Sequence, residues 1–352
     1  MTDIPQKMFA LVQKLDGYSG TSEGPRIITL EPYLETAEIA VPQPGAGQVL
    51  IRVRTASVNP SDLHFIKGEY GQPCQRGVPA GFEGCGDVVA AGAGAQESAG
   101  GLMGQRVAFA VTQGGSGAWA EYALTDASAC IPLRPDVSDD DAAAQIVNPM
   151  SAMAMIGMAQ EAAGDGGAFV MSAATSQLCK LMIALGRDKG LRPIAMLRRA
   201  EAADALRALG AAEVLVTTAD DFGDRLKAVF RDLEPAIFFD AVGDQISERA
   251  FAAMPNGGRW VIYGKLDPTP PELRDLGQLI FMNKRIEGFW LTRWMRETPP
   301  EKLGAAVAEV QARFADGRWK TNVTAHLALR EVMEKLPAAL AQPDGKVIIT
   351  PS

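Results

Sequence analysis

Histidine and cysteine are scarce in this chain of 352 residues, which carries two histidines and four cysteines. With only His64 and His326 present, a mechanism that needs several imidazoles is excluded. The cysteines are scattered and form no Cys-x-x-Cys pair; they are Cys74, Cys85, Cys130 and Cys179. We therefore expect neither a disulfide framework nor a structural zinc site, and we expect the cytoplasm as the compartment.

Basic charge and long apolar runs are also lacking. Lysine and arginine number 34 against 42 aspartates and glutamates, and the net charge of −8 argues against nucleic acids and anionic membranes as partners. No apolar run approaches the roughly 20 residues that span a bilayer. Residues 1–7 form no charged-then-apolar leader, so nothing suggests export. The chain is 47% hydrophobic, and its length predicts two globular domains.

Residues 8–135 contain short apolar runs that are separated by glycine and proline. Examples are 49–53, 86–90 and 106–110, with glycine-rich loops expected at 91–95 and 114–117. This pattern predicts an antiparallel, barrel-like β domain.

After about residue 149, short apolar runs alternate with helical patterns. The expected strands are 167–171, 193–197, 213–216, 236–239 and 259–263, and the expected helices are 176–188, 200–209, 221–232 and 246–254. Such alternation predicts an α/β fold with a doubly wound parallel sheet, which binds ligands at the carboxyl ends of its strands. The tail adds helices over 300–315 and 329–341 and a strand over 346–350.

Four strings in order carry a family resemblance: Asn-Pro-Ser-Asp at 59–62, Gly-Phe-Glu-Gly-Cys-Gly at 81–86, Gly-Gln-Arg-Val at 104–107 and Gly-Ala-Trp-Ala-Glu-Tyr at 117–122. Together they resemble the zinc-independent medium-chain dehydrogenases/reductases, namely quinone oxidoreductases and 2-enoyl thioester reductases. The resemblance implies a GroES-like catalytic domain over 1–148 that is completed by 295–352. It also implies a Rossmann domain over 149–294 that binds NADPH, and a homodimer.

Three further strings are similar to the mitochondrial-type 2-enoyl thioester reductases. They are Asn-Pro-Met-Ser-Ala at 148–152, Gly-Phe-Trp-Leu-Thr-Arg-Trp at 288–294 and Gly-Glu-Tyr-Gly at 68–71, the last of which places Tyr70 as the catalytic tyrosine. The resemblance implies cofactor contacts from Asn148, from residues 263–266 with Tyr263 and Gly264, from Phe289, Trp290 and Leu291, and from Lys346. Core packing remains an alternative for the aromatic residues, as does an edge-strand charge for Lys346.

No metal is expected. Alcohol dehydrogenases of this superfamily hold catalytic zinc with a cysteine and a His-Glu pair. The resemblance places Asn59 and Phe82 at the cysteine and histidine positions, and neither side chain is a useful zinc ligand.

The first turn of the expected nucleotide domain departs from the usual pattern. Dinucleotide sites favour glycines there, so that backbone amides at a helix N-terminus approach the pyrophosphate. Here Gln177 and Cys179 occupy the two glycine places, and we expect Thr175, Ser176, Gln177 and Leu178 to line the cofactor. A degenerate turn that has lost its ligand remains an alternative.

Arginines follow the second expected strand, where an acidic residue would accept the ribose hydroxyls of NAD. Arg198 and Arg199 instead suit the 2′-phosphate of NADPH, because guanidinium groups bind phosphate in bidentate fashion. Two solvated arginines at the start of a helix are the alternative.

Without zinc, hydride transfer needs a substrate whose own carbonyl withdraws charge, such as an enoyl thioester, an enone or a quinone. Tyr70 is the expected donor to the enolate oxygen, and Asn59 is expected to shape the same site. Two alternatives to the enoyl thioester reductase stay open: a quinone reductase, and a non-catalytic relative that keeps the fold. His64 follows the Asn-Pro-Ser-Asp turn, where a proton relay is less expected than a solvated or core histidine.

Overall fold

The structure is a computed structural model that describes residues 4–95, 101–342 and 344–351. The first three residues of the N-terminal segment considered above lie outside this range. Contacts within the chain divide it into unit 1, which comprises Met1–Val147 and Val307–Ser352, and unit 2, which comprises Asn148–Ala306. In this division the chain returns to unit 1 within helix α11 (Pro300–Ala315).

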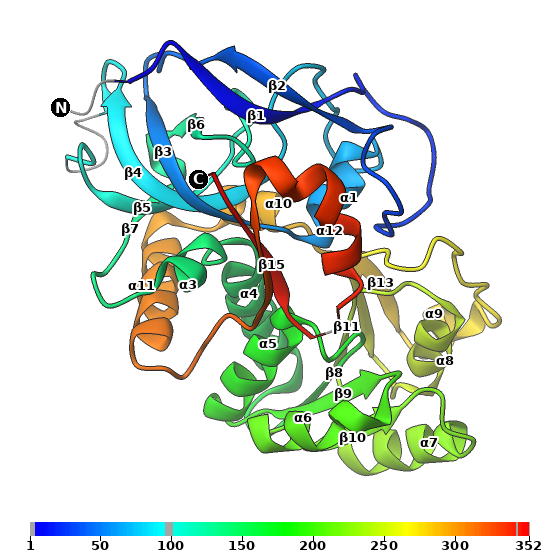
Figure 1. Cartoon of the computed structure of the whole chain (residues 1–352). Coiled ribbons are helices and arrows are strands. Elements are labelled where there is room, and N and C mark those ends of the chain that lie inside the picture. The colour runs from blue at the N-terminus through cyan, green and yellow to red at the C-terminus, as the bar shows by residue number, and fades with distance from the viewer. Residues whose placement is uncertain (1–3, 96–100, 343, 352) are drawn as a thin grey trace. The chain divides into compact units, whose positions relative to one another are not determined.

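Unit 1 is built mainly from strands (Figure 1). Its elements are β1 (Lys7–Gln13), β2 (Leu34–Ala40), β3 (Gln48–Ser57), α1 (Pro60–Ile66), β4 (Glu83–Ala91), β5 (Arg106–Ala110), β6 (Tyr122–Asp126), η1 (Ala127–Ala129), β7 (Cys130–Pro132), α3 (Asp139–Ala143), β14 (Val323–Ala328), η3 (Leu329–Glu331), α12 (Val332–Leu340) and β15 (Lys346–Thr350). One sheet has the order β14-β15-β3-β4-β5-β7, with β6 also paired to β3, and β1 and β2 form a hairpin-like pair. The pairs are antiparallel except β14 with β15.

The core of unit 1 lies among these strands, because apolar side chains of β3, β4 and β5 alternate toward one side. Val49, Ile51, Val88 and Phe109 belong to this core, together with Trp119, and all five are fully buried. The expected β-rich domain is therefore confirmed, and its last strand forms where the tail predicted it.

Helix α1 begins where the sequence predicted only a turn. Asn59 is its N-cap residue, Pro60 occupies the first helical position, and Asp62 completes a capping box by accepting the Asn59 backbone N–H at 2.7 Å. Asn-Pro-Ser-Asp thus ends β3 and starts a helix within a few residues, as its capping chemistry allows.

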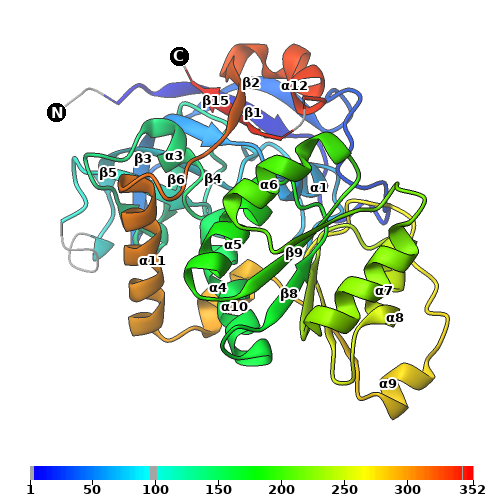
Figure 2. The ribbon, with the colours of Figure 1, turned by 90° about the horizontal axis from the view of Figure 1, so that it is seen from below.

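Unit 2 contains a parallel sheet between two layers of helices. Its elements are α4 (Val147–Ala163), β8 (Ala168–Met171), α5 (Gln177–Asp188), β9 (Arg192–Leu197), η2 (Ala200–Ala202), α6 (Ala203–Leu209), β10 (Glu213–Val216), α7 (Phe222–Leu233), β11 (Ile237–Asp240), α8 (Gln245–Ala253), β12 (Arg259–Ile262), α9 (Gly277–Phe281), β13 (Arg285–Gly288) and α10 (Leu291–Glu297). Helices α5 and α6 lie on one face of the sheet, and α7 and α8 lie on the other (Figure 2).

The sheet order of unit 2 is β10-β9-β8-β11-β12-β13, and all its pairs are parallel. Numbered along the chain, this is the order 3-2-1-4-5-6 of the Rossmann fold. Its central strands are apolar on both faces, with Phe169, Phe238 and Phe239 fully buried. The expected doubly wound sheet is confirmed, and β13 adds a sixth strand that the sequence had not predicted.

Among the described residues, no helix is both long enough and apolar enough to cross a membrane.

Candidate active site and nucleotide site

The strand order of unit 2 reverses between β8 and β11, which is where open α/β sheets bind their ligands. Ser172 follows β8, and Asp240 ends β11. The Ser172 hydroxyl donates to the Asp240 carboxylate at 2.6 Å, and so joins the ends of the two strands. Asp240 also accepts from the Ser247 hydroxyl at 2.9 Å and from the Trp260 indole at 3.0 Å.

Backbone N–H groups of the loop that follows β11 also donate hydrogen bonds to the Asp240 carboxylate. Val242 N–H and Gly243 N–H lie 3.0 and 3.1 Å from its two oxygens. Burial raises the pKa of Asp240, while these donors oppose the rise. The carboxyl group therefore holds in place the loops that follow β8 and β11, where the strand order reverses. It is itself too enclosed to bind a ligand.

The turn after β8 holds its shape without glycine. Ala173 has φ of +48°, a left-handed conformation that costs a non-glycine residue about 1–2 kcal/mol. Ala174 N–H donates to Met196 O at 3.0 Å, and Ser176 N–H donates to Ala173 O at 2.9 Å. Thr175 and Ser176 are half-buried. The turn is therefore tied to the end of β9, and its small side chains lie at the N-terminus of α5.

Ser176 caps α5 by accepting the Cys179 N–H at 3.3 Å. Gln177, Leu178 and Cys179, in the first turn of the helix, are all buried. The Cys179 thiol lies 3.3 Å from Ser172 O and 3.6 Å from the Tyr263 hydroxyl. Burial raises the pKa of Cys179, so the thiol stays protonated and acts as a packing and weak donor group.

Tyr263 and Gly264 follow β12. Burial, reinforced by Cys179, raises the pKa of Tyr263 well above its usual range, so its hydroxyl remains a neutral donor. Gly264 approaches Ala241 so closely that a Cβ would lie 2.7 Å from Ala241 O. A side chain at 264 would therefore separate the loops that follow β11 and β12.

Arg198 and Arg199 follow β9, and both are exposed. The Thr218 hydroxyl donates to Arg198 O at 2.8 Å and fixes the backbone at this strand end. Because the turn at Ala174 binds the same strand at Met196, the arginines lie at the edge of unit 2 that carries the turn.

The remaining predicted residues of unit 2 lie at helix starts. Asn148 is half-buried in the first turn of α4, and Leu291 is half-buried in the first turn of α10. Phe289 and Trp290 precede α10 and are half-buried, with Trp290 as its N-cap residue. None of these aromatic rings, nor that of Tyr263, belongs to the cluster of buried apolar residues around Trp260.

In unit 1, Tyr70 lies in an aromatic cluster after α1. Its ring centroid lies 5.1 Å from that of Phe82 and 6.4 Å from that of Phe65, and the tyrosine itself is half-buried. The preceding Glu69 is buried and accepts from the Thr21 hydroxyl at 2.8 Å and from the Glu23 N–H at 2.7 Å. His64 is buried beside Glu69, with Nδ1 3.4 Å from its carboxylate. This histidine is thus a buried core residue, and it helps to fix the segment that carries Glu69 and Tyr70.

Asn59 and Lys346 come together in a buried polar cluster of unit 1. The Asn59 Nδ2 donates to Glu83 Oε1 at 2.8 Å and to Ser57 Oγ at 3.2 Å, while its Oδ1 accepts from the Lys346 ammonium. The ammonium also donates to Val58 O at 3.3 Å. Burial lowers the pKa of Lys346, and the nearby carboxylates of Glu83 and Asp62 oppose this.

This cluster corrects the alternative that Lys346 is an edge-strand charge. Lys346 is only 5% exposed, and β15 pairs with strands on both sides. Both ends of the Asn59 amide are thus hydrogen-bonded within unit 1. The sequence did not suggest the Asn59–Lys346 pair, because the two residues are 287 positions apart.

The residues at the expected zinc-ligand places do not fit a metal. Asn59 is occupied by Glu83 and Lys346, Phe82 has no ligand atom, and the Lys346 ammonium would repel a nearby cation. Within the described ranges, no group of three or more His, Cys, Asp or Glu side chains is arranged to hold a metal ion.

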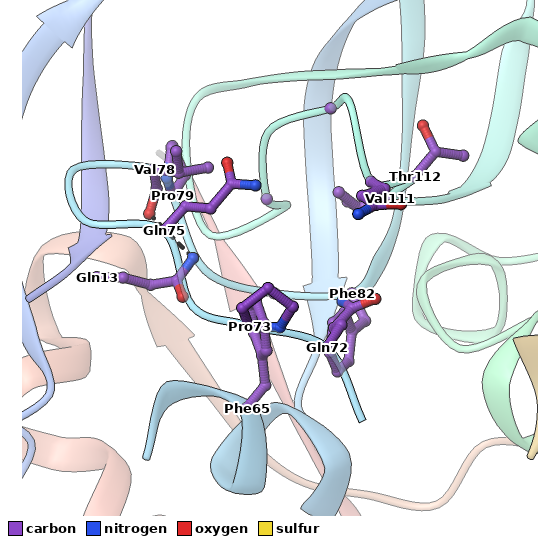
Figure 3. Close-up of a pocket in the computed structure, with 14 residues that line it drawn as sticks. Gln13, Phe65, Gln72, Pro73, Gln75, Val78, Pro79, Phe82, Val111 and Thr112 are labelled. Carbon is purple, nitrogen blue, oxygen red and sulfur yellow. Dashed lines mark hydrogen bonds between the residues drawn. The ribbon is translucent and has the colours of Figure 1, made fainter. Parts of the chain in front are cut away.

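A groove opens beside the aromatic cluster of unit 1. Phe65 and Phe82 both line it. Gln13, Gln75, Val78 and Pro79 lie on one side of it and Val111 and Thr112 on the other (Figure 3). Gly81, which also lines the groove, packs closely against Trp119: a Cβ at this position would lie 2.4 Å from the Trp119 ring.

Two sequence families match separate parts of the chain. The alcohol dehydrogenase GroES-like domain matches residues 45–135, and the zinc-binding dehydrogenase family matches residues 177–309.

Individual proteins match over nearly the whole length. A mitochondrial enoyl-acyl-carrier-protein reductase from Bos taurus is 28% identical over 87% of this chain and 82% of its own. A solved structure from Mesorhizobium loti, provisionally named NADPH:quinone reductase, is 50% identical with a TM-score of 0.94 over 99% of this chain and 100% of its own. A mitochondrial 2-enoyl thioester reductase heterodimer from Candida tropicalis is 21% identical, with a TM-score of 0.77 over 98% and 99% of the two chains, and it supports the fold alone.

The buried position of Cys179 generates a prediction about stability. Cys179→Gly removes a packed thiol and leaves a cavity, so the free energy of unfolding should fall by about 1 kcal/mol without tighter binding of NADPH. Chemical denaturation and a nucleotide titration measure the two effects. Cys179→Ala, which keeps the Cβ, should lose less, and Cys130→Ala serves as the control at a less buried cysteine. Unchanged stability together with several-fold tighter NADPH binding would contradict the packing role.

Proposed function

Because the chain belongs to the medium-chain dehydrogenase/reductase superfamily, we propose that it is an NADPH-dependent, zinc-free reductase of activated carbon–carbon double bonds, with a 2-enoyl thioester as substrate. The observation that carries the proposal is Tyr70, a half-buried phenol beside an uncharged groove. The name of the Bos taurus relative, an enoyl-acyl-carrier-protein reductase, supports the substrate class.

The residues of unit 2 fit a dinucleotide phosphate. Ser176 and the small side chains of the turn leave the N-terminus of α5 open to a pyrophosphate, and Arg198 and Arg199 are exposed where a 2′-phosphate is bound in Rossmann folds. We assign cofactor contacts to these residues together with Thr175, Gln177, Leu178, Tyr263, Gly264, Asn148, Phe289, Trp290 and Leu291. The assignment of Lys346 rests on the family resemblance, and in this structure its ammonium is bound by Asn59 and Val58.

The main task of the protein's own residues in this reaction is to stabilise the charge that develops on the substrate. When bound, NADPH supplies a hydride for the β-carbon of the substrate. Charge then gathers on the substrate carbonyl oxygen, and a donor that is already in place stabilises it. We assign Tyr70 to this role, because its phenol O–H is a hydrogen-bond donor. Asn59 holds the start of α1, and with it the segment that leads to Tyr70.

A quinone is the second candidate substrate, because the 50% identical protein carries the provisional name NADPH:quinone reductase. A non-catalytic role finds less support. The turn keeps its capped geometry although Gln177 and Cys179 replace glycines, since Ala173 adopts the left-handed conformation that a glycine would take.

The arginine pair generates a prediction about cofactor choice. NADPH should bind at least about tenfold tighter than NADH, because a lost bidentate phosphate contact costs 1.4 kcal/mol or more. Arg198→Ala with Arg199→Ala should remove most of this preference, as measured by calorimetric titration of both nucleotides. Arg192→Ala, an exposed arginine at the opposite end of β9, is the matched control. Equal affinities in the unmodified protein would contradict the assignment.

Tyr70 generates a prediction about turnover. Tyr70→Phe should lower kcat for crotonyl thioester by roughly tenfold to a thousandfold, a range typical of a lost oxyanion donor or general acid. NADPH affinity should change little, because the ring is kept. The loss should be smaller for a quinone, which can take protons from solvent. Tyr122→Phe is the control within the same unit, and parent rates for Tyr70→Phe on both substrates would show that Tyr70 only packs.

We also propose a homodimer that forms along the free edge of the unit 2 sheet. Strand β13 ends the described sheet, and edge strands offer unpaired backbone groups to a partner. The neighbouring helix α9 exposes Ile280 and Phe281, at 72% and 85% of their surface, and Leu276 just before it is 59% exposed. Exposed apolar side chains beside an edge strand are typical of an interface.

Light scattering after gel filtration tests the dimer. The unmodified protein should have twice the chain mass of 37.4 kDa, and Ile280→Asp with Phe281→Asp should give the monomer. Ile28→Asp, at an 80% exposed apolar residue of unit 1, should leave the mass unchanged. A monomeric parent protein at micromolar concentration would refute this interface.

For the compartment we propose the cytoplasm. All four cysteines are free, and three of them are buried. Free thiols persist in a reducing compartment, which supports this assignment.

A further inference from the structure

The groove of unit 1 has uncharged walls that are rich in carboxamides. Four glutamines line it, namely Gln13, Gln72, Gln75 and Gln113, and no Asp, Glu, Lys or Arg is among its described lining residues. Most of its other lining residues are apolar, with Phe65 and Phe82 among them, and Thr112 is polar. A carboxamide offers both donors and an acceptor. The groove therefore suits a neutral ligand that alternates apolar atoms with hydrogen-bonding groups, and it offers no cation to a phosphate.

Gln13 contributes an acceptor that the protein itself does not use. Its side chain is 1% exposed, and its Nε2 donates to Val78 O at 3.3 Å (Figure 3). That bond fixes the orientation of the amide, since a flipped Oε1 would face another acceptor. The Oε1 has no hydrogen-bond partner among the residues that the structure describes. Leaving a buried acceptor unpaired is unfavourable, so a ligand donor placed here gains affinity.

The groove also adjoins the proposed catalytic tyrosine. Phe65 and Phe82 line the groove and contact the Tyr70 ring, with centroids 6.4 and 5.1 Å away. A substrate whose carbonyl reaches Tyr70 therefore has its neighbouring atoms within reach of the groove.

We propose that the groove binds an amide-bearing arm of the thioester substrate, and that Gln13 Oε1 accepts the N–H of that amide. The inference rests on the proposed function and narrows its substrate class. A secondary amide supplies one donor and one acceptor, which match the carboxamide walls. A simple quinone carries only acceptors, and it would leave Gln13 unpaired. Gln13 is thus a specificity residue for substrates whose carrier arm contains amides.

A pair of substrates that differ in one atom tests this. The first is the crotonyl thioester of N-acetylcysteamine, and the second is the crotonyl thioester of 2-mercaptoethyl acetate, in which an ester oxygen replaces the amide N–H. KM for the amide substrate should be about three- to tenfold lower, as expected for one neutral hydrogen bond, with similar kcat. Gln13→Met, which keeps the length of the side chain, should remove this difference. Gln105→Met, at an exposed glutamine outside the groove, should preserve it.

The outcomes separate this inference from the proposed function. Equal KM values for the two substrates in the unmodified enzyme would overturn the role of Gln13, even while both are reduced. If Gln13→Met weakens both substrates equally, Gln13 is only structural, and the inference also fails. If neither substrate is reduced, the proposed function fails, and saturation-transfer NMR with the saturated butyryl pair still reports which arm the groove binds. Should Gln13→Met not fold, the comparison on the unmodified enzyme decides alone.

Discussion

The buried carboxylate of Glu83 ties together the parts of unit 1 on which the site depends. Its Oε1 accepts from the Ser57 hydroxyl at 2.7 Å and from the Asn59 amide at 2.8 Å, and its Oε2 accepts from the N–H groups of Ile146 and Val147 at 3.1 and 2.8 Å. The end of β3, the cap of α1, the start of β4 and the backbone at residues 146–147 are thus all hydrogen-bonded to one side chain of unit 1. A buried carboxylate without such donors would be too costly to retain, so the four donors and the acid depend on one another.

Lys346 and the carboxyl groups of Glu83 and Asp62 hold Asn59 and Phe82, the two residues at the expected zinc-ligand places. Lys346 reaches Asn59 from β15, and Asp62 caps α1 and accepts from the Phe82 N–H at 2.7 Å. Burial raises the pKa of Asp62 to about 7, although its two backbone donors oppose the rise. Around these groups the backbone of Asn59 and Phe82 is fixed, and Phe82 in turn packs against Tyr70. A metal is not needed to shape the pocket, because hydrogen bonds to two carboxylates do so.

Local sequence patterns predicted most of the fold. The apolar runs of unit 2 are continuous and bounded by glycine or polar residues, so five of its strands and the helices between them followed from periodicity. Strand β13 was missed because two of its four residues, Arg285 and Glu287, are charged, so it forms no apolar run. Helix α1 was read as a turn, because Asn-Pro-Ser-Asp is typical of both a turn and a capped helix.

The site was only partly predictable for a different reason. Tyr70 and the arginine pair were suggested by motifs, and Cys179 by the absence of a glycine. The Asn59–Lys346 contact and the unpaired acceptor of Gln13 depend on residues that are distant in sequence, and no local pattern encodes them. The replaced turn shows the same limit. The sequence indicated a missing glycine, but only the structure shows that Ala173 adopts a left-handed conformation and that the buried Cys179 thiol contacts the Tyr263 hydroxyl.

The central claim is that this chain transfers hydride from NADPH to an activated double bond without a metal. A direct measurement uses NADPH that carries deuterium at the reactive nicotinamide carbon, a crotonyl thioester and an excess of a metal chelator. Mass spectrometry and NMR of the product should show one deuterium, located at the β-carbon of a butyryl thioester. A product without deuterium, or reduction that stops when the chelator is added, would contradict the account.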